Sequence, residues 1–283
     1  MENNFIEVQI IFNKENYEEL YNALYVKGIE NILEENGSLK VYFEEKSTKE
    51  VNALKKFLIK EKIISENDIE VVKLKNQNWN ENWERSIEPV YIKEKIIVYP
   101  SWKKNELKNI ENKILIEIDP KMSFGTGHNE TTQLVLELMS DYIIGEEKKL
   151  LDFGTGTGIL TIAGIKLGVE SAVAIDIDDD SISNAMEYFG RNSVKDKVKL
   201  LNKNISQIED DSFDVICANI IRSVIIDNIE HITAKINPKG KLFISGILSS
   251  EDQEILEFLT QYEFEVVDII IKSEWIGIYA VKL

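Results

Sequence analysis

The feature that most constrains the fold of this chain is an apolar strand that runs directly into a glycine-rich turn. Residues 150–153 are typical of a buried strand, and the turn that follows has glycine at every second position: Gly154, Gly156 and Gly158. Glycine lets a backbone turn tightly and approach a ligand closely, because no Cβ stands in the way. Ile159 then opens a helical pattern, so the segment predicts a strand–loop–helix unit that holds a ligand at its loop.

An acid and a missing glycine indicate which ligand this loop would hold. Asp176 ends the next predicted strand, where a carboxylate can accept hydrogen bonds from both hydroxyls of a ribose. A dinucleotide-binding pattern would need glycine at position 159, because a diphosphate crowds the start of the helix, and that position holds Ile159. The spacing therefore favours S-adenosyl-L-methionine over NAD. A purely structural glycine turn is the alternative.

Beyond residue 131, predicted strands and helices alternate along the chain. Strands are expected at 149–153, 171–175, 198–201, 213–218 and 241–247, and helices at 160–167, 180–189, 225–236 and 250–260. This alternation predicts a doubly wound α/β sheet of parallel strands, whose ligand cleft lies at the carboxyl ends of the strands. The last two apolar runs, 264–270 and 275–281, lie too close together for a helical crossover, so we expect an antiparallel hairpin.

The first 75 residues follow a different plan. Strands are expected at 4–12, 29–33, 39–43 and 69–74, and helices at 15–26 and 48–60. The resulting order matches a small ferredoxin-like α+β domain. Residues 76–125 are interpreted as a linker with connecting strands near 96–99 and 115–118, and residues 126–283 as the cofactor-binding domain. The linker holds three tryptophans that either pack between the domains or contact substrate: Trp79, Trp83 and Trp102.

Composition excludes several classes of protein. One cysteine, Cys217, and two histidines, His128 and His231, give no reason to expect a disulfide or a metal site. The net charge of -17 disfavours nucleic acid binding; it either attracts a basic partner or simply keeps the protein soluble. No apolar run approaches the roughly 20 residues that cross a bilayer, and the acidic start is no signal peptide. We expect a soluble, cytoplasmic monomer.

A loop before the predicted sheet carries further candidates for cofactor contacts. Phe124, held between short polar residues and glycine, could lie over a flat ring. Thr132 precedes a helix expected at 134–139, which it could cap while its hydroxyl faces the cofactor; capping alone is the other reading.

The end of the strand expected at 213–218 supplies a candidate for the reaction itself. Asn219 follows that strand, where its carbonyl either orients an incoming amine or merely satisfies a turn. Cys217 lies within the strand and is interpreted as core, not as a nucleophile. The polar run 178–181 is expected to cap the helix that follows Asp176.

Several segments of the chain occur together in the order known from one protein family. They are NWNENWERSIEPVYI with VYPSW, DPKMSFGTGHNETT, LLDFGTGTGILTIAGIKLG, IDIDDDSISNA, VICANI, LFISGIL and EWIGIYAVK. In these the chain resembles the PrmA family, methyltransferases of large-subunit ribosomal protein eleven, the protein of the ribosomal stalk base. The resemblance implies a Rossmann-like class I methyltransferase sheet and S-adenosyl-L-methionine as cofactor. It further implies a substrate-recognising ferredoxin-like domain and methylation of lysine side chains or, in some members, an amino-terminal amine.

The resemblance also assigns site residues. It places cofactor contacts and their neighbours at Thr132, Gly154, Asp176, Asn219, Phe124, Thr126 and Gly156. Many family members have histidine where this chain has Asn129, and His128 sits one place earlier, so no histidine is given a role.

The expected reaction needs little chemistry from the protein. Methyl transfer from a sulfonium has a good leaving group, so the enzyme mainly aligns the reactants and excludes water. We expect no covalent intermediate and no strong general base, with Asn219 as the catalytic residue that orients the amine. Two alternatives stay open: a methyltransferase of the same fold that acts on another protein or a small molecule, and a non-catalytic nucleoside-binding protein.

Overall fold

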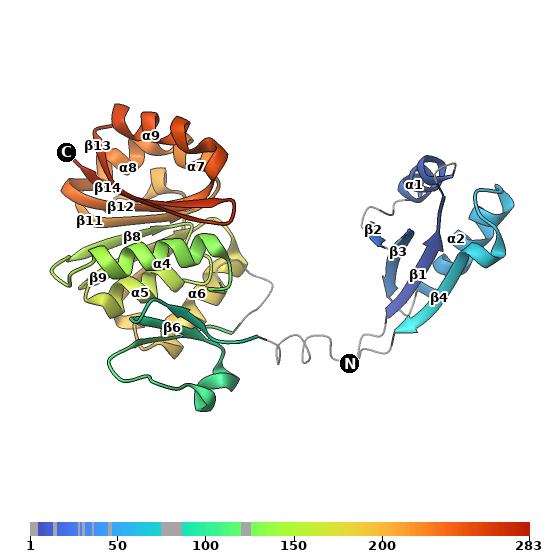
Figure 1. Ribbon diagram of the computed structural model, residues 1–283, viewed down its shortest axis with the longest axis horizontal. Coiled ribbons are helices and arrows are strands. Elements are labelled where there is room, and N and C mark those ends of the chain that lie inside the picture. The colour runs from blue at the N-terminus through green and yellow to red at the C-terminus, as the bar shows by residue number, and fades with distance from the viewer. Residues whose placement is uncertain are drawn as a thin grey trace. The chain divides into compact units, whose positions relative to one another are not determined.

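A computed structural model describes most of the chain, as two compact units. The described residues are 5–13, 16–27, 29, 32–35, 37–44, 47–74, 87–119 and 126–283. Contacts divide the chain into residues 1–86 and 87–283, coloured blue to cyan and green to red in Figure 1. The described strands of 87–119, which we expected in a linker, have their contacts in the second unit. The division into 1–75, 76–125 and 126–283 stays a prediction.

The first unit is a four-stranded antiparallel sheet with two helices. Its elements are β1 (Phe5–Ile11), α1 (Tyr17–Val26), β2 (Ile32–Glu35), β3 (Ser38–Glu44), α2 (Thr48–Lys60) and β4 (Ile69–Leu74). The strand order β2-β3-β1-β4 confirms the expected α+β plan; β2 is described over Ile32–Glu35, where a strand at 29–33 was expected. Alternate residues of β1 (Ile6, Val8 and Ile10) are buried in one core with Leu24 of α1 and Leu58 of α2.

The second unit contains a seven-stranded mixed sheet. Its elements are α4 (Glu130–Tyr142), β8 (Lys149–Phe153), α5 (Ile159–Leu167), β9 (Ser171–Asp176), α6 (Asp179–Arg191), β10 (Val198–Asn202), β11 (Phe213–Asn219), α7 (Arg222–Asp227), α8 (Ile229–Lys235), β12 (Ile236–Leu248), α9 (Asp252–Gln261), β13 (Phe264–Lys272) and β14 (Trp275–Lys282). The strand order is β10-β9-β8-β11-β12-β14-β13, with β14 antiparallel to both neighbours. The doubly wound sheet and its terminal hairpin are therefore confirmed.

Helices cover both faces of this sheet, as Figure 1 shows for α4 to α6 and for α7 to α9. Neighbouring residues of a strand point to opposite faces. Leu150 accordingly packs with α4, α5 and α6, whereas Leu151 packs with α7, α8 and α9. Cys217 is fully buried in the first of these cores, which confirms its interpretation as a core residue.

Two helix predictions were wrong in detail. The helix expected at 225–236 is two helices, α7 and α8, because Asn228 leaves helical geometry between them, and its Nδ2 donates 2.9 Å to the carbonyl of Val224. The helix expected at 134–139 begins at Glu130, so Thr132 lies within its first turn. The N-cap position belongs to Asn129, and the proposed capping role of Thr132 is therefore wrong.

A three-stranded sheet precedes the main sheet in the second unit. It consists of β5 (Val90–Ile92), β6 (Ile96–Tyr99) and β7 (Ile114–Glu117), in that order, with a 3₁₀ helix η3 (Ser101–Glu106) after β6. Trp102 lies in η3 with 37% of its surface exposed. Trp79 and Trp83 lie outside the described residues. No helix in the described part of the chain is long and apolar enough to span a membrane.

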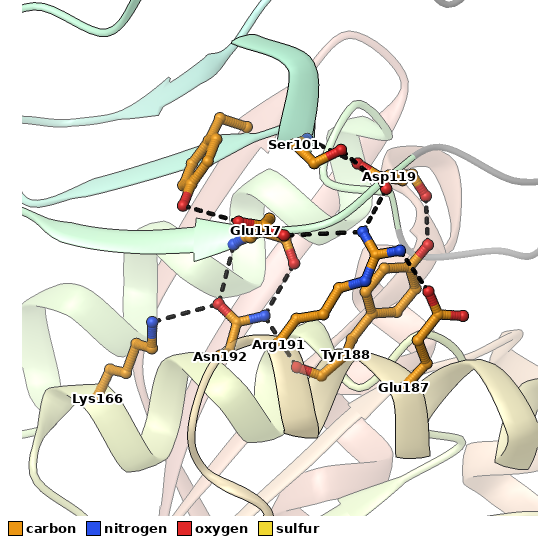
Figure 2. A network of polar contacts seen from close by, with 9 residues as sticks. Ser101, Glu117, Asp119, Lys166, Glu187, Tyr188, Arg191 and Asn192 are labelled. Atoms are coloured by element: carbon orange, nitrogen blue, oxygen red, sulfur yellow. Dashed lines mark hydrogen bonds and ion pairs between the residues drawn. The ribbon is translucent and has the colours of Figure 1, made fainter. Parts of the chain in front are cut away.

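A polar network attaches β7 to the last turn of α6 (Figure 2). The side chain of Asn192 pairs with the backbone of Glu117 as a neighbouring strand would: Oδ1 accepts from the N–H at 2.9 Å and Nδ2 donates to the carbonyl at 2.8 Å. Asp119, just beyond β7, accepts from the backbone and hydroxyl of Ser101 and forms an ion pair with Arg191. Tyr188 donates to the Asp119 carbonyl at 2.5 Å. The segment that leaves β7 is thus fixed to α6.

Candidate active site

The glycine loop is held against the end of the neighbouring strand. The backbone N–H groups of Gly154 and Thr155 both donate to the carbonyl of Ile175, at 3.0 and 2.9 Å. Gly154 has a φ of +77°, and a Cβ added there would lie 2.5 Å from the side chain of Ile220. Both observations favour glycine, because other residues rarely adopt this backbone conformation and a Cβ would collide with the side chain of Ile220.

Asp176 is held at the carboxyl end of β9 by two backbone groups. Its Oδ2 accepts from the N–H of Gly156 at 2.9 Å, and its Oδ1 accepts from the N–H of Asp178 at 3.1 Å. A carboxylate offers about four acceptor positions, so each oxygen can accept one further donor. Asp178 caps α6 by accepting from the N–H of Ser181 at 2.9 Å, which confirms the capping predicted for this run.

A cavity of about 720 Å³ opens at the carboxyl ends of the strands. Its volume lies within the range for small-molecule sites. Its lining comprises His128, Asn129, Glu130, Thr131, Phe153, Gly154, Gly156, Asp176, Ile177, Ser181, Lys203, Asn204, Asn219, Ile220, Ile221, Val224, Gly246 and Trp275. The cavity therefore reaches from the end of β10 across the sheet to the start of β14.

The structure brings four of the seven predicted site residues to this cavity: Gly154, Gly156, Asp176 and Asn219. Thr126 and Thr132 are not among its lining residues, and Phe124 lies outside the described residues. Sequence reasoning missed Lys203, Asn204 and Trp275.

Asn219 is buried beside the cavity with one half of its amide in use. Its Nδ2 donates to the hydroxyl of Thr132 at 3.1 Å. Its Oδ1 is buried and has no hydrogen-bond partner among the described residues. A buried amide oxygen without a donor is costly, so this atom is a candidate acceptor for a ligand N–H. Thr132, itself fully buried, orients Asn219 through this contact.

Asp152 is a fully buried carboxylate directly before the loop. Its Oδ2 accepts from the hydroxyls of Thr155 and Thr161, both at 2.7 Å, and from the Thr161 N–H at 3.1 Å. Its Oδ1 has no partner among the described residues. Burial raises the pKa of Asp152 to about 6, although the hydrogen bonds from Thr161 and Thr155 oppose this rise.

The arrangement suits an adenosyl sulfonium. Glycines keep the loop open, Asp176 offers acceptors where a ribose would lie, and Asn219 offers a buried acceptor two strands away in the sheet order β9-β8-β11. Among the described residues, no cluster of three His, Cys, Asp or Glu side chains could hold a metal ion. Fold and site together define a class I methyltransferase that depends on S-adenosyl-L-methionine.

Comparison with known proteins identifies the family within this class. The family model "Ribosomal protein L11 methyltransferase (PrmA)" matches residues 4–283, and the chain belongs to this family. The enzyme of Clostridium perfringens (strain SM101 / Type A) is 32% identical over 254 residues, which are 87% of this chain and 80% of that protein. The enzyme of Thermoanaerobacter pseudethanolicus is 31% identical over 284 residues, with 98% and 88% covered.

A solved structure agrees with this assignment. The ribosomal protein L11 methylase of Lactobacillus delbrueckii subsp. bulgaricus matches with a TM-score of 0.64 and 28% identity, over 70% of this chain and 100% of that one. The expected family, cofactor and reaction are therefore confirmed: the protein is an S-adenosyl-L-methionine-dependent enzyme that methylates ribosomal protein L11.

Proposed function

We propose that the methyl acceptors are lysine amines of ribosomal protein L11, and that Asn219 orients them. The observation that carries this proposal is the buried Oδ1 of Asn219, which has no donor among the described residues. An amine that donates one N–H to this oxygen directs its lone pair away from it, toward the rest of the cavity. Thr132 keeps the other half of the amide occupied, so the acceptor faces the substrate.

The cofactor end of the cavity is assigned to the glycine loop and Asp176. Asp176 would accept from the ribose hydroxyls, and Gly154 and Gly156 would let the methionine part approach the backbone. When bound, the cofactor would supply a methyl group on a sulfonium, from which a neutral thioether leaves as the methyl passes to the amine. Thr126 and Phe124 stay predicted neighbours, and Thr132 is proposed to act through Asn219 instead of touching the cofactor.

The acceptor end of the cavity favours an uncharged amine. A lysine amine has an unperturbed pKa near 10.4 and must lose a proton before it attacks a methyl group. Ile220, Ile221 and Val224 follow Asn219 in the chain and line the cavity, and an apolar surrounding destabilises the charged ammonium. The proton can therefore pass to water as the amine enters, without a strong general base. Cys217 is the one cysteine of the sequence; it is buried in the core and is not among the cavity-lining residues. A covalent intermediate on a cysteine therefore has no support, and direct methyl transfer is favoured.

The molecule is proposed to act as a monomer without binding nucleic acid. The net charge of -17 repels phosphate backbones and suits a partner that presents lysines. A ribosomal protein as substrate also supports a cytoplasmic location.

Replacing Asn219 by Ala tests the assignment. The variant should lower kcat for L11 by about tenfold or more while it changes cofactor affinity little, because it removes the amine acceptor and the bond to Thr132 but leaves the glycine loop and Asp176 intact. Steady-state kinetics with purified L11 and calorimetry with S-adenosyl-L-methionine measure the two quantities. Asn237→Ala is a matched control, since Asn237 lies near the amino end of β12 and bonds Asp214. Unchanged kcat in Asn219→Ala would refute the role.

A further inference from the structure

Gln133 joins the backbone at residues 127 and 128 to the β13–β14 hairpin through one side-chain amide. Its Nε2 donates to the carbonyls of Gly127 and His128, at 3.1 and 3.0 Å. Its Oε1 accepts from the ammonium of Lys272. Both N–H groups and the carbonyl of this amide are therefore in use, although Gln133 itself is not among the cavity-lining residues.

The two carbonyls that Gln133 holds belong to a tightly confined stretch of backbone. Gly127 has a φ of +84°, and a Cβ there would lie 2.8 Å from the side chain of Val98. The next three residues, 128–130, line the cavity. Because hydrogen bonds to two successive carbonyls fix both peptide planes, Gln133 determines how this wall enters α4.

The third partner belongs to the β13–β14 hairpin. Lys272 ends β13, and the next residue, Ser273, donates its hydroxyl to Glu130 at 2.6 Å. The turn then leads into Trp275, which lines the cavity. Two side-chain contacts thus tie the hairpin to the first turn of α4, the turn that also carries the Thr132 partner of Asn219.

We propose that Gln133 is a positioning residue for methyl transfer, which holds the 127–130 wall and the hairpin in place around Asn219. This inference rests on the function proposed above for Asn219. Neighbouring strands lie about 4.8 Å apart, so a cavity from β10 to β14 spans roughly 24 Å. Asp176 lies at the β9 side of that span, and its two hydrogen bonds, from the N–H groups of Gly156 and Asp178, do not involve Gln133. Lys272 belongs to the hairpin at the other side, whereas Gly127 packs against Val98 and Ile159. Loss of Gln133 should therefore disturb the acceptor more than cofactor binding.

Three variants separate the two sets of contacts. Gln133→Glu keeps an acceptor for Lys272 but removes both donors to the Gly127 and His128 carbonyls. Lys272→Met removes the cation and leaves those donors intact. The double variant Gln133→Arg with Lys272→Glu reverses the polarity, since an arginine can donate both to the carbonyls and to the new carboxylate.

The kinetic result expected is a split between turnover and cofactor binding. Gln133→Glu should lower kcat for L11 by about tenfold or more, because small misplacements of reacting groups are costly. Its dissociation constant for S-adenosyl-L-methionine should stay within about twofold of wild type. Lys272→Met should have a smaller effect on kcat, and the double variant should recover much of the loss. Gln253→Glu, which adds a charge on exposed α9, is the matched control.

A second readout needs neither cofactor nor substrate. In the cofactor-free protein, Gln133→Glu should speed amide hydrogen exchange in residues 127–130. Its melting temperature should fall by a few degrees at most, because these two bonds are only part-buried or exposed and water can replace the lost donors. Unchanged exchange or unchanged kcat overturns the inference, as does a loss of kcat that merely follows a fall in melting temperature. If wild type and Asn219→Ala are equally active, the function proposed for Asn219 fails instead, and the exchange measurement still decides whether Gln133 fixes the wall.

Discussion

A carboxylate that is buried from solvent lies directly before the cofactor loop, and burial destabilises its ionised form. Asp152 is fully buried, and one of its oxygens has no donor among the described residues. Its hydrogen bonds with Thr155 and Thr161 tie β8 to the first turn of α5, which explains an acid at this position. Burial dominates nevertheless, so the pKa in the folded state is raised to about 6.

Asp152→Asn should therefore change the pH dependence of stability. A raised pKa means that Asp152 contributes stability below its unfolded pKa near 3.8, and that this contribution is lost as pH rises through about 6. Relative to the variant, the free energy of unfolding of the wild type should fall by about 1–3 kcal/mol between pH 4 and pH 7. Denaturant unfolding at a series of pH values measures this difference. A difference that does not vary with pH would contradict the raised pKa.

Only part of the site could be predicted residue by residue. Gly154 and Asp176 were found because their role depends on spacing along the chain and on the ends of adjacent strands. Lys203 and Trp275 follow other strands, and only the strand order brings them to the same cavity. The dependence of Asn219 on Thr132 was equally invisible, since a hydrogen bond between residues 87 positions apart leaves no local pattern.

At the scale of elements, periodicity predicted the sheet and most helices. Most strands of the main sheet are predominantly apolar runs bounded by turns, and such patterns are decided locally. The break between α7 and α8 was missed, because Asn228 interrupts an apolar run of helical period without proline or glycine. The start of α4 was missed for a related reason: its first turn, from Glu130, is polar, so the apolar pattern begins only at Leu134.

The attachment of β7 to α6 can be tested at Asn192. This residue is 5% exposed and bonds both the N–H and the carbonyl of Glu117 (Figure 2). Asn192→Ala should cost about 1–3 kcal/mol of unfolding free energy, because two backbone groups lose their partner. Asn228→Ala is the comparison, since Asn228 makes one such bond, to Val224, and should cost less. If urea unfolding gave the same loss of unfolding free energy for Asn192→Ala and Asn228→Ala, the second backbone bond of Asn192 would add no stability.

At the scale of the whole molecule, we expect the net charge to affect how fast the substrate associates with the enzyme. A net charge of -17 produces a negative field that attracts a lysine-bearing partner over a distance set by ionic strength. That field acts on association and not on the transfer step.

Raising salt should therefore lower kcat/KM for L11 more than kcat. Between roughly 50 and 500 mM NaCl the screening length falls from above 10 Å to well below it. Over this range we expect a steep decline of kcat/KM and a nearly constant kcat. Initial rates at low and at saturating L11 measure the two constants. A kcat/KM that is independent of salt would assign the acidity to solubility alone.

Calorimetric titration of S-adenosyl-L-methionine into the wild type and Asp176→Ala tests the cofactor pocket most directly. The wild type should bind this cofactor and not NAD, and Asp176→Ala should lose about 1–3 kcal/mol of binding free energy through the missing charged acceptor. Equal affinity of the two proteins would contradict the role of Asp176, and binding of NAD in place of S-adenosyl-L-methionine would contradict the cofactor assignment.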